Sequence, residues 1–225
     1  MPALLNTVDP EGLEEFSVVF TDRSLNHMSA AFQGVMRDIS AMLKEVYNAE
    51  AVAVVPGGGT FGMEAVARQF ARGVEVLVVR NGWFSYRWSQ IIENGDLTGN
   101  ATVLKARMQG NSTPAPFAPC PIDEVVEAIR AQKPKVVFAP HVETSAGVIL
   151  PDDYIKQMAE AAHEVGALMV LDSIASGCAW VDMKALGIDV LISAPQKGWS
   201  ASPSAGLVMM SARAVARLAE TTSDS

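Results

Sequence analysis

The chain has 225 residues, of which 49% are hydrophobic and 19% charged, so it can bury a substantial core and does not have the composition of a disordered segment. Its 17 basic and 25 acidic residues give a net charge of −8 without any basic run, which argues against binding to nucleic acid. The apolar stretches are far shorter than the roughly 20 residues of a membrane span. With no leader pattern at the start and only Cys120 and Cys178, both expected to be free thiols, we expect a cytoplasmic protein without a membrane anchor or a metal site.

Hydrophobic periodicity along the chain predicts alternating helices and strands. An acidic opening, 1–24, is interpreted as an N-terminal arm, and apolar residues at spacings of three and four predict a long helix over Leu25–Tyr47. Further helices are expected at Thr60–Ala71, Trp83–Ile92, Ile122–Ala131, Pro151–Val165 and from Ala212 to Glu220. Strands are expected at Ala51–Val55, Val74–Val79, Ala101–Leu104, Val136–Ala139, Ala167–Leu171, Val190–Ser193 and Leu207–Met210. This order predicts a three-layer αβα fold with a mostly parallel sheet in one domain, 25–225, crossed on its surface by a proline-rich loop, Ala106–Pro121.

A glycine-rich turn follows the first strand and precedes a helix. Gly57, Gly58 and Gly59 would let backbone amides approach an anion, and the helix that follows offers unpaired N–H groups, so the turn could bind a phosphate. A turn that merely needs glycine flexibility is an equal alternative. The spacing Gly57, Gly59, Gly62 also matches a dinucleotide-binding fingerprint, but no acidic residue closes the next strand, and no Gly-Lys-Ser or Gly-Lys-Thr completes a P-loop.

Two ionisable residues follow buried strands at the edge where open α/β sheets bind ligands. Asp172 ends an apolar run, where a buried carboxylate needs a cationic partner. Lys197 follows a later strand among small and aromatic residues, so we expect a partly desolvated amine suited to Schiff-base chemistry.

Polar and aromatic residues follow two further strands. Trp83 and Phe84 could stack on a planar cofactor, although core packing is the commoner fate of aromatic residues. Thr144 or Ser145 could contact a ligand, or belong to a hydrogen-bonded loop. Together these segments supply an anion-binding turn, an aromatic plate, a hydroxyl, a carboxylate and a lysine, which is the set that a pyridoxal phosphate site requires.

In five motifs, in this order, the sequence resembles the class V aminotransferases of fold type I, and most closely the alanine–glyoxylate and serine–pyruvate branch. The motifs are Gly-Gly-Gly-Thr-Phe-Gly-Met-Glu at 57–64, Asn-Gly-Trp-Phe at 81–84, His-x-Glu-Thr-Ser at 141–145, Asp-Ser-Ile-Ala-Ser at 172–176 and Gln-Lys-Gly at 196–198. The resemblance implies the large domain of a pyridoxal 5'-phosphate enzyme that moves an amino group between alanine or serine and glyoxylate or pyruvate.

The resemblance also implies a role for each matching residue. Gly58, Gly59, Thr60 and Gln196 would hold the phosphate region, Phe84 and Ile174 would cover the two ring faces, Thr144 would reach the ring hydroxyl, Asp172 the pyridine nitrogen, and Lys197 would carry the aldimine and transfer the Cα proton. The expected partners are the amino acid and 2-oxo acid substrates and a second copy in a homodimer, with neither nucleic acid nor membrane.

Three alternatives remain open at this point. A cysteine desulfurase usually has histidine before the lysine and as the stacking plate, where this chain has Gln196 and Phe84. An NAD-binding oxidoreductase would use Gly57 to Gly62, and a non-catalytic scaffold would not need Lys197. Measured against the resemblance, 225 residues stop before any C-terminal small domain, so we expect a truncated subunit that holds most of the cofactor site and has little activity alone.

Overall fold

The computed structural model describes residues 30–111, 114–177 and 179–221. These residues belong to two compact units that divide inside the first helix, α1 (Ala30–Tyr47), between Met42 and Leu43. The expected N-terminal arm, the first residues of the expected helix Leu25–Tyr47 and Cys178 lie outside the described residues. Within the described ranges, no helix is both long enough and apolar enough to cross a membrane.

A seven-stranded sheet forms the centre of the unit that starts at Leu43. Its strands are β1 (Ala51–Pro56), β2 (Val76–Arg80), β3 (Ala101–Lys105), β6 (Val136–Pro140), β9 (Leu168–Asp172), β10 (Val190–Ser193) and β11 (Ala205–Met210). They lie in the order β1-β11-β10-β9-β6-β2-β3, and every pair is parallel except the two that involve β11. β11 alone runs against the others, so all the remaining strands end at the same edge of the sheet.

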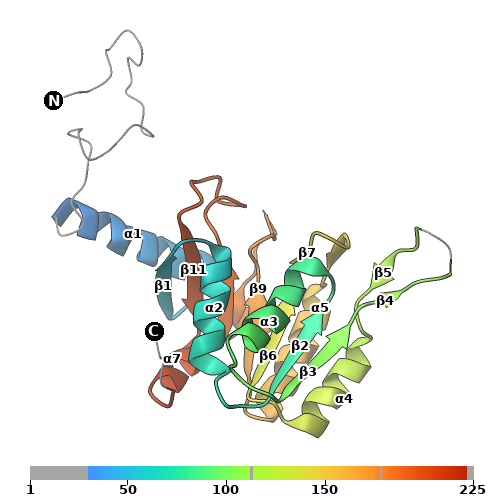
Figure 1. Cartoon of the computed structure of the whole chain (residues 1–225). Coiled ribbons are helices and arrows are strands. Elements are labelled where there is room, and N and C mark those ends of the chain that lie inside the picture. The colour runs from blue at the N-terminus through green and yellow to red at the C-terminus, as the bar shows by residue number, and fades with distance from the viewer. Residues whose placement is uncertain (1–29, 112–113, 178, 222–225) are drawn as a thin grey trace. The chain divides into compact units, whose positions relative to one another are not determined.

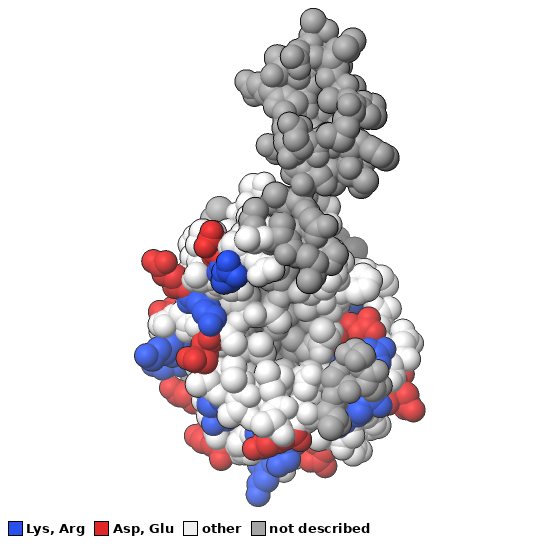
Figure 2. Space-filling view, turned by 90° about the vertical axis from the view of Figure 1, so that its left-hand side faces the viewer, with Lys and Arg blue, Asp and Glu red and all other residues white. Residues whose placement is uncertain are grey.

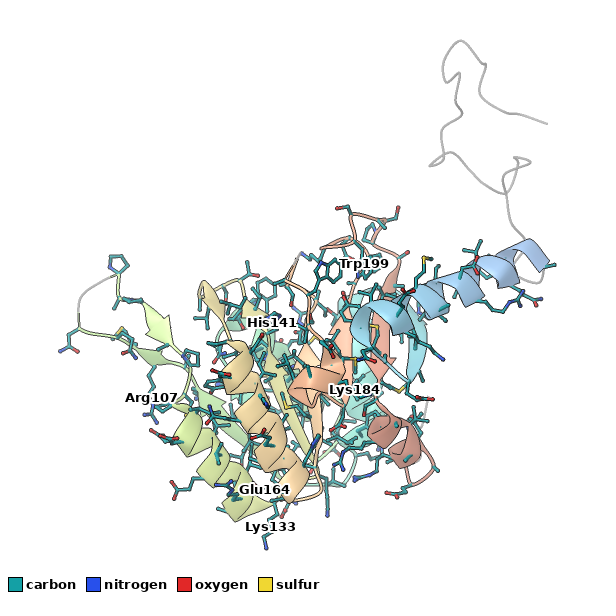
Figure 3. All side chains as sticks on the ribbon, turned by 180° about the vertical axis from the view of Figure 1, so that it is seen from behind. Arg107, Lys133, His141, Glu164, Lys184 and Trp199 are labelled. Carbon is teal, nitrogen blue, oxygen red and sulfur yellow. The ribbon has the colours of Figure 1, made fainter. Side chains whose placement is uncertain are left out.

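Helices cover both faces of this sheet. The helices of this unit are α2 (Gly59–Phe70), α3 (Trp83–Asn94), α4 (Ile122–Gln132), α5 (Asp152–Glu164), α6 (Met183–Leu186) and α7 (Ala212–Leu218). Figure 1 shows α2 and α3 in front of the sheet, and Figure 3, seen from behind, shows α4 and α5 on the other face. The predicted α/β fold with a mostly parallel sheet between helical layers is confirmed.

The alternation of side chains along the strands determines which residues face which layer. Val76, Phe138 and Val170 pack in one buried cluster with Trp88 of α3 and Phe70 of α2. Residues an even number of positions from these on the same strand therefore face α2 and α3, and the residues between them face α4 and α5.

Two short hairpins were not predicted. The segment Ala106–Pro121, expected to be a loop, contains β4 (Arg107–Met108) paired with β5 (Phe117–Ala118). A second hairpin joins β7 (Val142–Glu143) and β8 (Val148–Ile149) after β6. Strands of two residues give no measurable period in a sequence, so only their pairing across the turn reveals them.

Charged side chains of both signs are mixed on the face of the molecule drawn in Figure 2. Blue and red atoms alternate along its sides and lower rim, and much of the centre is uncharged. This face therefore carries no continuous basic area of the kind that binds a nucleic-acid backbone.

Candidate functional site

The structure brings the segments singled out in the sequence to one edge of the sheet. The glycine turn follows β1, and Phe84 lies shortly after β2. Thr144 comes after β6, Asp172 is the last residue of β9, and Lys197 comes after β10. These strands run in the same direction, so residues up to 140 positions apart meet at the carboxyl edge, where open α/β sheets bind their ligands.

The glycine turn is shaped by a close approach to the loop after β9. Gly57 has a φ of 117°, a region that favours glycine. Gly58 is the N-cap of α2 and gives the helix no side-chain cap, so the first N–H groups of α2 can serve an anion. A Cβ on Gly59 would lie 2.6 Å from Cδ1 of Ile174, so a larger residue at 59 would push the Ile174 side chain away from its position.

Asp172 carries a buried carboxylate with little compensation. Its side chain is 8% exposed and, like Val170, faces the layer of α2 and α3. Oδ1 accepts a hydrogen bond from the N–H of Ile174 at 3.0 Å. Burial raises the pKa of Asp172 to about 6, and the charge of Glu143 adds to this, while the Ile174 N–H and the charge of Arg87 oppose it. Such a carboxylate is suited to hold a cationic group of a ligand.

Glu143, whose role the sequence did not reveal, fixes the start of α3. Its carboxylate is completely buried and accepts hydrogen bonds from the N–H groups of Phe84 and Ser85 and from the hydroxyls of Ser85 and Ser145, both at 2.6 Å. Burial raises its pKa, but these bonds outweigh burial and hold the pKa below its usual range. This cap attaches Phe84 to the β7–β8 hairpin, which carries Thr144. Both Phe84 and Thr144 are exposed at this edge.

Arg87 is a second residue that sequence reasoning missed. Its guanidinium lies 3.3 Å from the hydroxyl oxygen of Thr60, and its charge lowers the pKa of Asp172. The helix period offered a signal, since Arg87 lies three residues after Phe84 and so shares a face of α3 with it. The site therefore has a cation beside the glycine turn.

The loop after β10 presents Lys197 to solvent. The side chain of Lys197 is exposed, whereas its neighbours predicted a partly desolvated amine, so that expectation is wrong for the structure described here. The loop packs through other residues: Gly198 lies so close to the carbonyl of Gly177 that a Cβ there would overlap it, and Trp199 packs on the rings of Trp180 and Tyr47 at 5.0 and 6.2 Å. Figure 3 shows Trp199 and His141 toward the same edge of the sheet.

Gln196 contributes a buried acceptor next to the lysine. Its Oε1 is buried and makes no hydrogen bond within the part of the chain that the structure describes. Because a buried carbonyl oxygen without a donor is costly, this atom indicates a hydrogen-bond donor other than the described residues.

The mostly parallel sheet between helical layers matches the fold of fold type I aminotransferase structures. A family model described as "Aminotransferase class-V" matches residues 13–223, and the chain belongs to that family. The resemblance found in the sequence is thereby confirmed.

Several proteins of known name or structure are similar to this chain. The "Soluble hydrogenase 42 kDa subunit" of Anabaena cylindrica is 30% identical over 194 residues, which cover 84% of this chain and 48% of that protein. An alanine–glyoxylate aminotransferase of Oryctolagus cuniculus is 30% identical over 199 residues, or 86% of this chain and 47% of that protein. The solved ureidoglycine–glyoxylate aminotransferase of Bacillus subtilis superposes with a TM-score of 0.74 at 26% identity, covering 87% of this chain and 48% of that one. The chain thus spans about half the length of the curated relatives it matches.

Proposed function

We propose that this chain binds pyridoxal 5'-phosphate and serves the transfer of an amino group between a small amino acid, alanine or serine, and a 2-oxo acid, glyoxylate or pyruvate. The observation that carries the proposal is the buried carboxylate of Asp172 at the same sheet edge as Lys197. The glyoxylate aminotransferases among the similar proteins support the choice of substrates.

The residues at the carboxyl edge fit this cofactor in two respects. The Asp172 carboxylate, with its pKa raised to about 6, lacks the strong cation that a protonated pyridine nitrogen would provide. Gly59 leaves room for Ile174 beside the anion-binding turn, where the cofactor would have both a phosphate site and an apolar ring contact.

Each of these residues would contact the part of the cofactor nearest to its position. Gly58, Gly59 and Thr60 at the start of α2, with Arg87 close by, would hold the phosphate, and Gln196 would lie in the same region. Phe84 and Ile174 would cover the two faces of the ring, and Thr144 would bind the ring hydroxyl.

The chemistry that pyridoxal phosphate supplies when bound is electron withdrawal from Cα of the amino acid. Asp172, ionised beside the pyridine nitrogen, would keep a proton on that nitrogen. The Nζ amine of Lys197 is the group that would bind the cofactor covalently and move the Cα proton. Because the side chain of Lys197 is exposed at this edge, Nζ is accessible to the cofactor and to the amino acid.

The sheet order gives no support to the dinucleotide alternative. A dinucleotide fingerprint requires its glycine turn to follow a strand in the middle of a parallel sheet, with the next strand of the βαβ unit nearby. Here β1 is an edge strand paired antiparallel with β11, and four strands separate it from β2.

The test is whether Lys197 reacts with the cofactor. The purified chain mixed with pyridoxal 5'-phosphate should develop a visible absorbance band, and borohydride should fix the cofactor on the peptide that contains Lys197, as located by mass spectrometry. Lys197→Ala should abolish both signals, whereas the exposed Lys184→Ala should leave them unchanged. Alanine or serine should then bleach the band, and glyoxylate or pyruvate should restore it. A chain that develops no band with saturating cofactor would refute the proposal.

A separate experiment tests the phosphate site. Arg87→Gln should weaken binding of pyridoxal 5'-phosphate by about tenfold or more, because a charge-assisted contact is lost. Binding of pyridoxal, which has no phosphate, should change little. Arg68→Gln is the matched control, since Arg68 lies in the same groove between α2 and α3 but pairs with Glu64. Equal losses for both cofactor forms would show that Arg87 does not act on the phosphate.

A further inference from the structure

A histidine and two serines form a buried polar row behind Asp172. His141, Ser173 and Ser176 are 4%, 4% and 9% exposed. Nδ1 of His141 lies 2.7 Å from the hydroxyl of Ser176, and the hydroxyl of Ser173 lies 2.7 Å from the same oxygen. His141 continues the alternation of Val137 on β6, so this row lies toward α5, on the face of the sheet opposite to the Asp172 carboxylate.

The Ser176 hydroxyl joins the other two members of the row. It lies 2.7 Å from both the Ser173 hydroxyl and Nδ1 of His141, and Nδ1 donates or accepts according to the ring tautomer. Burial, partly opposed by the charge of Asp152, lowers the pKa of His141, which favours the neutral ring. The imidazole therefore acts in the row as a hydrogen-bonding group and not as a charge.

The row is joined to the backbone turn 172–177. The N–H of His141 donates to the carbonyl of Asp172 at 2.8 Å, and the N–H of Ser173 donates to the carbonyl of Ile192 at 2.8 Å. Within the turn, Ser176 N–H donates to the Ser173 carbonyl at 3.3 Å. Hydrogen bonds therefore fix both ends of the turn. The backbone of Asp172 and Ser173 is bonded to His141 and Ile192, and the side chain of Ser176 is bonded to the imidazole of His141.

The same turn meets the cofactor site at three points. Asp172 begins it, Ile174 extends from its middle against Gly59, and the carbonyl of Gly177 at its end contacts Gly198, next to Lys197. A shift of the turn would therefore move the carboxylate, the apolar ring contact and the lysine loop together.

We propose that His141, acting through Ser176 and Ser173, is a positioning residue that fixes the turn 172–177 and so sets the distances between Asp172, Ile174 and the Lys197 loop. The effect on the cofactor rests on the proposed function. The fixing of the turn does not, because it is a property of the chain without any ligand.

Four variants separate this role from general stability. Ser176→Ala and His141→Leu break the row. His141→Asn retains a hydrogen-bonding group near the place of Nδ1, because an asparagine side chain offers both a donor and an acceptor. Ser211→Ala is the matched control: its hydroxyl also donates to a buried side chain, that of Asp189, but ahead of β10, at the opposite edge of the sheet.

The first measurement is amide hydrogen exchange of the cofactor-free chain. Peptides covering 172–177 should exchange about tenfold faster in Ser176→Ala and His141→Leu, and at close to the wild-type rate in His141→Asn and Ser211→Ala. Unchanged exchange in the first two variants would overturn the proposal.

The second measurement is the affinity for pyridoxal 5'-phosphate. The dissociation constant should rise about tenfold in Ser176→Ala and His141→Leu and be restored in His141→Asn. If exchange accelerates and affinity stays the same, the turn is held by the row but does not position the site, and the proposal is wrong. If the wild-type chain binds no cofactor, the proposed function fails, and hydrogen exchange alone decides whether the row fixes the turn.

Discussion

Asp172→Asn is expected to make the cofactor-free chain more stable while it weakens the site. The wild-type carboxylate is buried, faces the layer of α2 and α3, and accepts a hydrogen bond from the Ile174 N–H. An asparagine oxygen can accept the same bond, so the substitution removes the buried charge with little loss of packing.

The magnitude follows from the pKa of Asp172, raised from 3.8 to about 6 by burial. The carboxyl group binds its proton more tightly in the folded chain than in the unfolded chain, so stability falls as the pH rises from about 4 to about 6. A difference of about two pH units, at 1.36 kcal/mol each, corresponds to about 3 kcal/mol above pH 6. The amide that replaces the carboxyl group does not titrate, so the variant should gain up to about 3 kcal/mol in the free energy of unfolding at about pH 7.5 and less than about 1 kcal/mol at about pH 4.

Urea unfolding followed by circular dichroism at both pH values measures this difference. Asp189→Asn is the matched control, because Asp189 is also a buried aspartate, but one that accepts bonds from His163, from the Met169 N–H and from Ser211, each at 2.9 Å. Burial raises the pKa of Asp189, but these bonds outweigh burial and lower it. The control should therefore lose about 2 kcal/mol at pH 7.5.

Destabilisation of the chain by Asp172→Asn at about pH 7.5, as by Asp189→Asn, would contradict the expected cost of the buried charge. That result would mean that the Asp172 carboxylate is already compensated within the chain and has no need of a ligand cation. A gain in the free energy of unfolding together with weaker cofactor binding would instead show that Asp172 serves the site and lowers the stability of the fold, as is common for functional sites.

Two further substitutions test the local geometry. Gly59→Ala should weaken cofactor binding by about tenfold in the absorbance titration and leave the chain folded, because its Cβ would displace Ile174. The control Gly99→Ala, with nothing within 4 Å of its Cβ and a position ahead of β3, should bind normally, and equal effects of the two would contradict the contact. Glu143→Gln should lower the free energy of unfolding by about 2 kcal/mol at pH 7, because a buried carboxylate that caps α3 loses its charge. Since the folded pKa of Glu143 is depressed, this difference should shrink as the pH falls through that pKa and the wild-type carboxylate takes up a proton; a constant difference across pH would speak against the role of the charge.

The sequence was sufficient to predict the α/β class and the edge where the site lies. Apolar runs of period two and helical runs of period 3.6 depend on neighbours along the chain, and they placed β6, β9 and α5 within a few residues of their observed bounds. Because parallel strands end at a common edge, the residues after each strand could be grouped before any contact was known. That rule brought the glycine turn, Asp172 and Lys197 together.

The tertiary structure decided what depends on residues far apart in the chain. The reversed direction of β11 and the position of β1 at the sheet edge come from pairing across more than 140 residues, which leaves no local pattern. The cap that Glu143 places on α3 and the approach of Arg87 to Thr60 likewise join different elements. The exposure of Lys197 depends on how its loop packs. Gly198 and Trp199 lie against Gly177 and Trp180, whereas the side chain of Lys197 is exposed.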